Sequence, residues 1–284
     1  MTQAALPGAI VSTEWLGANL GAPDLVVVDA SWYLPAAGRD PRAEYEAGHV
    51  PGAVFWDLDA LSDRGSPLPH MLPAPAELVR QIAALGIGDG DRVVVYDGSG
   101  LNLSAPRVWW TLRVAGHDAV AVLDGGIGRW RAERRPVEAG LVRRPPAVFT
   151  RAFHAALVRS QAEMQALLES GAAQILDARS RGRFRGAEPE PRPGLRGGHI
   201  PGARNLPFNE LVDAEGRLLS PDELRRRYRA AGVDLTRPVV TTCGSGVTAC
   251  ALALGLELLG HRHYAVYDGS WAEWGREPGP PIER

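Results

Sequence analysis

The stretch AGHVPGAVFW at residues 47–56 returns as GGHIPGARNL at residues 197–206, with His, Pro, Gly and Ala in register. Three further pairs of similar stretches occur in the same order in both halves of the chain: LVVVDASW at 25–32 with QILDARSR at 174–181, RVVVYDGSG at 92–100 with PVVTTCGSG at 238–246, and AVLDGGIGRW at 121–130 with AVYDGSWAEW at 265–274. Self-similarity of this kind is the signature of a repeated structural unit. The sequence therefore predicts a tandem duplication.

Each repeat alternates short runs rich in Val, Ile and Leu with longer amphipathic runs. Unbroken apolar strands that alternate with helices are typical of an α/β fold, in which a parallel sheet carries helices on both faces. We expect a first domain over 12–138, a linker over 139–165 and a second domain over 166–284. The linker is expected because the stretch around Pro145 lacks a periodic pattern.

Composition excludes several function classes. The chain has 284 residues and no lysine, so all 31 basic side chains are arginines. Schiff-base enzymes, pyridoxal-phosphate enzymes and Walker-type NTPases need a lysine that this chain lacks. A net charge of −2 favours no nucleic-acid partner, and the sequence shows neither a signal peptide nor an apolar run long enough for a membrane span. The expected location is the cytoplasm.

The segment after Pro238 carries the most informative chemistry. Residues 239–242 are predicted as a buried strand, 243–246 as a tight turn and 247–259 as a helix that ends at Gly260. This arrangement places the Cys243 sulfur at the carboxyl end of a strand, where unpaired amides of the turn and the first helical turn favour a thiolate. The alternative is a buried structural cysteine beside an ordinary turn. Cys250, two helical turns further on, is expected in the core.

The first repeat has Asp97 where the second has Cys243. A carboxylate is no sulfur nucleophile, so the first repeat is predicted to be structural and the second catalytic. Cysteine phosphatases use comparable loops, but they hold phosphate with an arginine a few residues after the nucleophile. The loop from Gly244 to Ala249 contains no cation, and sulfur transfer through a cysteine persulfide fits this small, neutral loop better.

The tandem organisation, the segment Cys243–Ala249, the segment at 198–203 and Tyr267–Trp271 resemble the two-domain rhodanese family. The likeness runs from about Ser12 to Trp274. Within the family it is greatest to the branch that uses 3-mercaptopyruvate, because the thiosulfate-using branch typically has two basic residues after the nucleophile. Here those positions are occupied by Gly244 and Ser245.

The resemblance implies a set of site residues. Arg183 and Arg192, within the segment from Gly182 to Arg192, match the arginines that hold the carboxylate and keto oxygen of the substrate. Asp59 and His70 match the relay partners of Ser245. The substrate-binding backbone of the loop is expected at the following residues: Gly244, Gly246, Val247 and Thr248. His49 and His199 recur in both repeats and are therefore interpreted as structural.

The implied reaction is a ping-pong transfer of sulfur from 3-mercaptopyruvate, through a Cys243 persulfide, to a thiol, thioredoxin or cyanide, with release of pyruvate. Neither half-reaction requires a metal or an organic cofactor. Two alternatives stay open: a thiosulfate sulfurtransferase of the same fold, and a non-catalytic persulfide carrier or redox-sensing module in which partners load Cys243.

Overall fold

The computed structural model describes residues 5–284 and divides them into two compact units. The first unit holds the chain up to Arg64 together with Leu72–His154 and Val212–Leu218. The second holds Gly65–Met71, Ala155–Leu211 and Leu219–Arg284. Each unit therefore contains a short segment from the other repeat of the sequence.

The first unit is built on a five-stranded sheet in the order β1-β5-β4-β2-β3, with all pairs parallel. The strands are β1 (Ile10–Val11), β2 (Leu25–Asp29), β3 (Val54–Phe55), β4 (Arg92–Tyr96) and β5 (Val120–Leu123). The helices are α1 (Thr13–Asn19), α2 (Pro41–Ala47), α3 (Pro75–Ala84), α4 (Ala105–Val114) and α5 (Gly126–Ala132), with a short 3₁₀ turn η1 (Pro35–Ala37).

The second unit repeats this topology in a parallel sheet ordered β6-β10-β9-β7-β8. Its strands are β6 (Val158–Arg159), β7 (Gln174–Asp177), β8 (Arg204–Asn205), β9 (Val239–Thr242) and β10 (Tyr264–Tyr267). The helices are α6 (Gln161–Ser170), α7 (Arg181–Phe184), α8 (Pro221–Ala230), α9 (Ala249–Leu258) and α10 (Ser270–Trp274), with the 3₁₀ turns η2 (Ala155–Leu157) and η3 (Phe208–Leu211). The predicted duplication of an α/β unit is confirmed.

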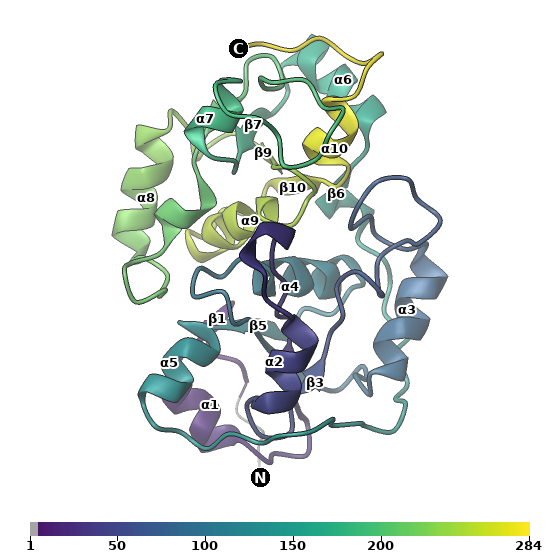
Figure 1. The fold of residues 1–284 in the computed structure, drawn as a ribbon, viewed down its shortest axis with the longest axis vertical. Coiled ribbons are helices and arrows are strands. Elements are labelled where there is room, and N and C mark those ends of the chain that lie inside the picture. The colour runs from purple at the N-terminus through teal and green to yellow at the C-terminus, as the bar shows by residue number, and fades with distance from the viewer. Residues whose placement is uncertain (1–4) are drawn as a thin grey trace. The chain divides into compact units, whose positions relative to one another are not determined.

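Helices cover both faces of the second sheet. One face packs Val240 of β9 and Tyr267 of β10 against Met164 of α6 and Trp271 of α10. Neighbouring residues of a strand point to opposite faces, and α9 packs on β9 and β10 from the other face (Figure 1). Residues 249–257 of α9 are all buried and, apart from Glu257, none of them has a charged side chain, as expected of a core helix.

Local sequence signals account for the helix ends. Ser220 and Glu223 form the capping box that starts α8, as the sequence indicates. Gly260, with φ +74°, follows the end of α9. The predicted helix at 247–259 begins two residues later than expected, because Gly246 adopts φ +76° and Thr248 serves as the N-cap. Within the stretch expected as a linker, residues 155–165 form η2, β6 and the start of α6.

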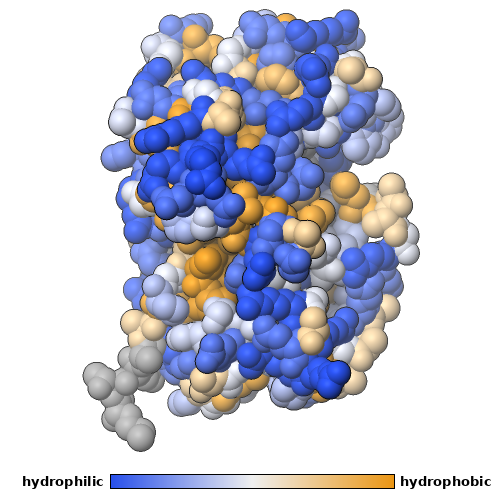
Figure 2. Space-filling model, turned by 90° about the vertical axis from the view of Figure 1, so that its left-hand side faces the viewer, coloured by the Kyte–Doolittle hydropathy of each residue, from blue (hydrophilic) through white to orange (hydrophobic). Residues whose placement is uncertain are grey.

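Hydrophilic side chains dominate the surface that each unit turns toward the viewer in Figure 2. None of the helices in residues 5–284 combines the length and apolarity needed to cross a membrane.

Candidate active site

Cys243 follows β9 directly and is 2 % exposed. Its amide donates to Ser270 Oγ at 3.2 Å, and its carbonyl accepts from the Trp271 amide at 2.9 Å. The next carbonyl, of Gly244, accepts from the Ala272 amide at 2.8 Å. The start of α10 therefore holds the backbone on both sides of the cysteine.

The loop after Cys243 presents amides with no acceptor of their own. Across residues 5–284, the amides of Gly244, Ser245, Val247 and Thr248 donate to no protein atom. Gly246 adopts a left-handed conformation, which turns the loop into the amino end of α9. Unpaired amides at the amino end of a helix can bind an anion, so these amides support the prediction of a thiolate or persulfide at Cys243.

The equivalent loop of the first unit is already filled by its own side chain. Asp97 Oδ2 accepts from the amides of Ser104 and Ala105 at 2.9 Å each, at the amino end of α4. Asp97 Oδ1 accepts from the amide of Ser99 at 2.9 Å and from its hydroxyl at 2.5 Å. The carboxylate thus binds the loop at Ser99 and caps the amino end of α4, which agrees with a structural first repeat.

His70 contacts the cysteine loop. Its Nδ1 lies 3.0 Å from Ser245 Oγ, and both side chains are buried. His70 has φ +60°, an uncommon conformation for a side chain of this size. Although it comes from the first repeat, it lies in Gly65–Met71, which belongs to the second unit. The structure therefore brings two of the three predicted relay residues together.

Arg276 ties the His70 segment to the second unit. Its Nη2 donates to the carbonyl of Pro67 at 3.0 Å, and its Nε donates to the carbonyl of Ala272 at 3.0 Å. Ala272 is also the residue that holds Gly244. One guanidinium therefore links the support of the cysteine loop to the backbone that carries the histidine.

Asp59 is described within the first unit only. Its carboxylate accepts from Trp32 Nε1 at 3.1 Å. Its relay role stays a prediction.

The guanidinium of Arg183 lies against the cysteine loop. A Cβ placed on Gly244 would be 2.9 Å from Arg183 Nη2. Only glycine therefore fits beside this guanidinium without a shift of the arginine side chain. The predicted clamp residue and the cysteine loop are neighbours in the second unit.

A buried carboxylate holds Arg183 in this position. Glu190 Oε2 accepts from Arg183 Nη2 at 2.6 Å, and Glu190 Oε1 accepts from Arg183 Nε at 3.3 Å and from Arg179 Nη1 at 2.7 Å. Arg179 also pairs with Asp177 and stacks over the ring of Trp271 at 4.3 Å. Burial opposes the charge of Arg179, but Asp177 and Glu190 outweigh it and raise the pKa of that guanidinium.

Arg192, the second predicted clamp residue, lines a cavity of about 370 Å³ in the second unit. Pro69, Ala272 and Arg276 also line it. Pro69 precedes His70, and Ala272 binds the loop at Gly244. The cavity therefore lies beside the His70 segment and beside the residue that holds Gly244.

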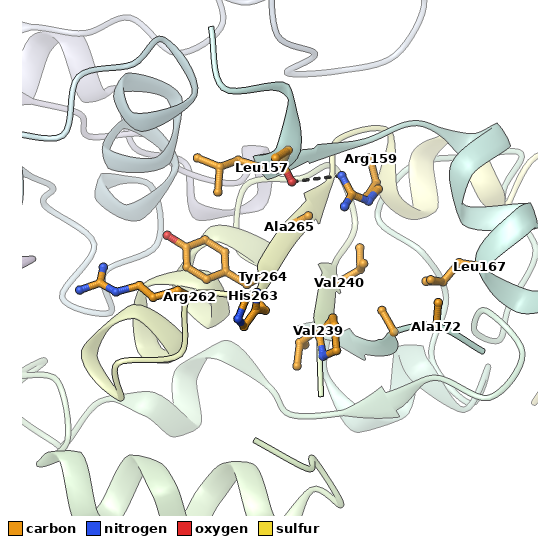
Figure 3. Close-up of a pocket in the computed structure, with 13 residues that line it drawn as sticks. Leu157, Arg159, Leu167, Ala172, Val239, Val240, Arg262, His263, Tyr264 and Ala265 are labelled. Atoms are coloured by element: carbon orange, nitrogen blue, oxygen red, sulfur yellow. Dashed lines mark hydrogen bonds between the residues drawn. The ribbon is translucent and has the colours of Figure 1, made fainter. Parts of the chain in front are cut away.

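Another cavity, of about 380 Å³, lies in the second unit at the amino ends of β9 and β10 (Figure 3). Its lining includes Val239 and Tyr264, the first residues of β9 and β10. Arg159 at this cavity donates to the carbonyl of Ala156 at 3.1 Å. Because Cys243 follows the other end of β9, this cavity is not the site of the predicted chemistry.

In residues 5–284, no group of three or more His, Cys, Asp or Glu side chains is placed to hold a metal.

Sequence reasoning missed three residues of this site. Glu190 lies within the arginine segment and Ser270 within a matching motif, but neither pattern indicates the role of the individual residue. Ser270 is fully buried with φ +48°, and its hydroxyl donates to the carbonyl of Tyr267 at 2.7 Å while it accepts from Cys243. The signal for Ser270 was its alignment with Gly126, which also has a positive φ. Arg276 carries no comparable signal in the sequence.

Comparison with known proteins places the chain in a family. The Rhodanese-like domain matches residues 12–133 and again 160–277. The chain is 46 % identical over 271 residues to 3-mercaptopyruvate sulfurtransferase of Homo sapiens, covering 94 % of this chain and 91 % of that protein. It is 44 % identical over 280 residues to thiosulfate sulfurtransferase of Bos taurus, covering 96 % and 94 %.

Solved structures agree with this assignment. The crystal structure of SseA from Escherichia coli, described as a 3-mercaptopyruvate sulfotransferase with the rhodanese fold, has a TM-score of 0.85 and 39 % identity and covers 93 % of this chain and 99 % of that one. Tum1 of Saccharomyces cerevisiae has a TM-score of 0.88 and 33 % identity, with 98 % of each chain covered. These relatives bear out the predicted fold and the predicted class of enzyme, and the chain belongs to the rhodanese-like domain family, of which it carries two copies.

Proposed function

We propose that this chain transfers sulfur from 3-mercaptopyruvate to a thiol acceptor through a persulfide on Cys243 and releases pyruvate. The observation that carries this proposal is the cysteine loop itself. Its amides are open to an anion, it contains no cation between Gly244 and Ala249, and the guanidinium of Arg183 lies against it. The names of the human and bovine relatives support a sulfurtransferase.

The first half-reaction is a displacement at sulfur. Arg183 and Arg192 bind the carboxylate and keto oxygen of the donor, because a guanidinium can offer two parallel N–H donors to planar oxygens. The Cys243 thiolate attacks the donor sulfur, so an S–S bond forms as the C–S bond breaks. The electron pair of the C–S bond leaves with the carbon as pyruvate enolate, and Cys243 retains the sulfur as a persulfide.

Proton transfer completes this step. The donor thiol loses a proton and the enolate carbon gains one, which gives pyruvate. The 3.0 Å hydrogen bond between His70 and Ser245 supports a general acid–base role for this pair at the loop. Asp59 is the proposed third member of the relay. Gly244, Gly246, Val247 and Thr248 form the substrate-binding loop, and the open amides of Gly244, Val247 and Thr248 stabilise the persulfide.

The second half-reaction returns Cys243 to its thiolate form. A small thiol, reduced thioredoxin or cyanide attacks the outer sulfur, and Cys243 leaves as the thiolate. Neither step consumes an oxidant or a reductant other than the acceptor. We propose the cytoplasm as the site of this reaction, and fractionation of cells that express the tagged chain tests that location.

The direct test supplies 3-mercaptopyruvate and cyanide and measures pyruvate and thiocyanate together. Equal amounts of both products are expected from the wild-type protein, and neither from Cys243→Ser. Cys250→Ser is the matched control, because Cys250 is buried in α9 and its thiol donates to the Gly246 carbonyl. Sustained turnover by Cys243→Ser would refute the assignment of the nucleophile.

A thiosulfate sulfurtransferase is the second candidate, favoured by the bovine relative. It predicts a higher kcat/KM for thiosulfate than for 3-mercaptopyruvate, whereas our proposal predicts the reverse. A non-catalytic carrier predicts that a protein donor loads Cys243 while no 3-mercaptopyruvate concentration yields pyruvate. Mass spectrometry of the Cys243 peptide, after addition of 3-mercaptopyruvate, thiosulfate or the protein donor without an acceptor, shows which of the three loads the cysteine.

A further inference from the structure

Glu190 is a buried carboxylate at the centre of a charged cluster behind the cysteine loop. Its side chain is 2 % exposed, and it accepts from both Arg179 and Arg183. Arg179 in turn pairs with Asp177 at 2.6 Å. Two guanidiniums and two carboxylates thus share one cluster, and their formal charges cancel.

The geometry decides which side of Arg183 remains for a ligand. A guanidinium offers one pair of parallel donors along its Nε–Nη2 edge and another along its Nη1–Nη2 edge. Glu190 occupies the first edge, with contacts of 3.3 Å to Nε and 2.6 Å to Nη2. A donor carboxylate therefore has to use the Nη1–Nη2 edge, which lies at the tip of the side chain.

The tip of Arg183 is also the part nearest to the loop, because Nη2 is the atom closest to a Cβ built on Gly244. Rotation of the guanidinium would break its contacts with Glu190. The buried carboxylate thus determines both the direction in which the clamp points and the net charge that it presents.

We infer that Glu190 is a positioning and specificity-determining residue: it aims the outer edge of Arg183 at a single planar carboxylate and neutralises the charge that would attract a dianion. This inference rests on the proposed function and extends it to donor choice. 3-Mercaptopyruvate carries one carboxylate, whereas thiosulfate carries two negative charges. The site therefore discriminates between the two donors partly through a residue that touches neither.

Glu190→Gln tests the inference, because it removes the charge and keeps the size of the side chain. We expect KM for 3-mercaptopyruvate to rise and KM for thiosulfate to fall, so that the ratio of kcat/KM for the two donors shifts toward thiosulfate by about tenfold. Glu210→Gln is the matched control. Glu210 pairs with Arg181 of the same helix α7 at 2.6 Å, but that arginine side chain is 53 % exposed and holds no part of the loop.

A purely structural role for Glu190 would lower kcat/KM for both donors by the same factor, and that result would overturn the inference. Glu190→Asp keeps the charge and shortens the side chain. It is expected to raise KM for 3-mercaptopyruvate without a gain toward thiosulfate. If Glu190→Gln does not fold, a gain toward thiosulfate in the Asp variant contradicts the charge argument, and an unchanged preference with a raised KM supports it.

Failure of the proposed function is recognised separately. If the wild-type protein forms no pyruvate from 3-mercaptopyruvate, the proposed function is wrong. If the wild-type protein turns over 3-mercaptopyruvate and Glu190→Gln shows the donor ratio of the wild type, only the inference about Glu190 is wrong.

Discussion

Replacement of Asp97 by alanine tests whether the first unit keeps its loop closed with its own carboxylate. The Asp97 side chain is 2 % exposed and accepts from three amides and one hydroxyl. Two of the amides, those of Ser104 and Ala105, are at the amino end of α4, where the helix dipole adds to the attraction. The variant leaves these donors buried without an acceptor.

The expected loss follows from these contacts. A hydrogen bond to a charged group contributes roughly 1.5–3 kcal/mol, and loss of a helix cap costs about 1 kcal/mol. The contributions overlap because water can enter part of the space left by the carboxylate. We therefore expect the free energy of unfolding of the first unit to fall by about 3 kcal/mol, which lowers Tm by about 6–12 °C for a unit of this size.

Urea unfolding and hydrogen exchange of the α4 amides measure this loss. The control is Asp118→Ala, since the Asp118 side chain is 65 % exposed and lies 3.6 Å from Arg113; its effect is expected to stay within about 0.5 kcal/mol. Refutation takes two forms. Asp97→Ala could match the control in stability, or it could abolish turnover while the first unit keeps its stability.

Three other variants test separate parts of the structure. Gly244→Ala places a Cβ 2.9 Å from Arg183 Nη2, so KM for 3-mercaptopyruvate is expected to rise about tenfold with little change in Tm or kcat; an unchanged KM would contradict the packing of the clamp against the loop. Arg276→Gln removes the hydrogen bond to the Pro67 carbonyl, so hydrogen exchange at residues 65–71 should quicken and kcat/KM should fall about fivefold; slower or equal exchange would exclude this anchoring role. Hydrogen bonds from Thr13 and Arg135 lower the pKa of Glu133 from 4.5 to about 2, so its stabilising effect is full above pH 4.5 and disappears as the pH falls toward 2. Glu133→Gln should therefore flatten the pH dependence of the urea midpoint in that range, and a parallel dependence in both proteins would contradict the assignment.

Much of the fold is predictable because its signals are local. The recurring Gly-His segment places His49 and His199 in matching surroundings: each Nδ1 lies 2.9 Å from a backbone carbonyl of a residue earlier in the chain, that of Tyr45 or Phe184. Both rings stack on the side chain of that same residue. These contacts support the structural interpretation of the two histidines, which stays a prediction. The burial predicted for Cys250 in the core is also confirmed.

The site is predictable only where a motif carries it. The cysteine loop and Arg183 follow from motifs, and the second unit brings them together. The role of Glu190 depends on how a Pro-rich loop folds back onto α7, and no periodicity of the sequence encodes that path. Ser270 adopts a φ of +48°, which is uncommon for a serine and cannot be predicted from the residue type. Arg276 acts on Pro67, 209 positions earlier in the chain, which is beyond any local pattern.

Each repeat contributes one short segment to the compact unit that the other repeat builds. Gly65–Met71 and Val212–Leu218 occupy corresponding places, each between the edge strand β3 or β8 and the next long helix, and each belongs to the unit built by the other repeat. Their sequences, GSPLPHM and VDAEGRL, share no residue at any aligned position, whereas the nearby Gly-His segments still match. These two segments therefore resemble one another less than the Gly-His segments do. Expression of either repeat alone would therefore leave its compact unit without one of the segments that complete it.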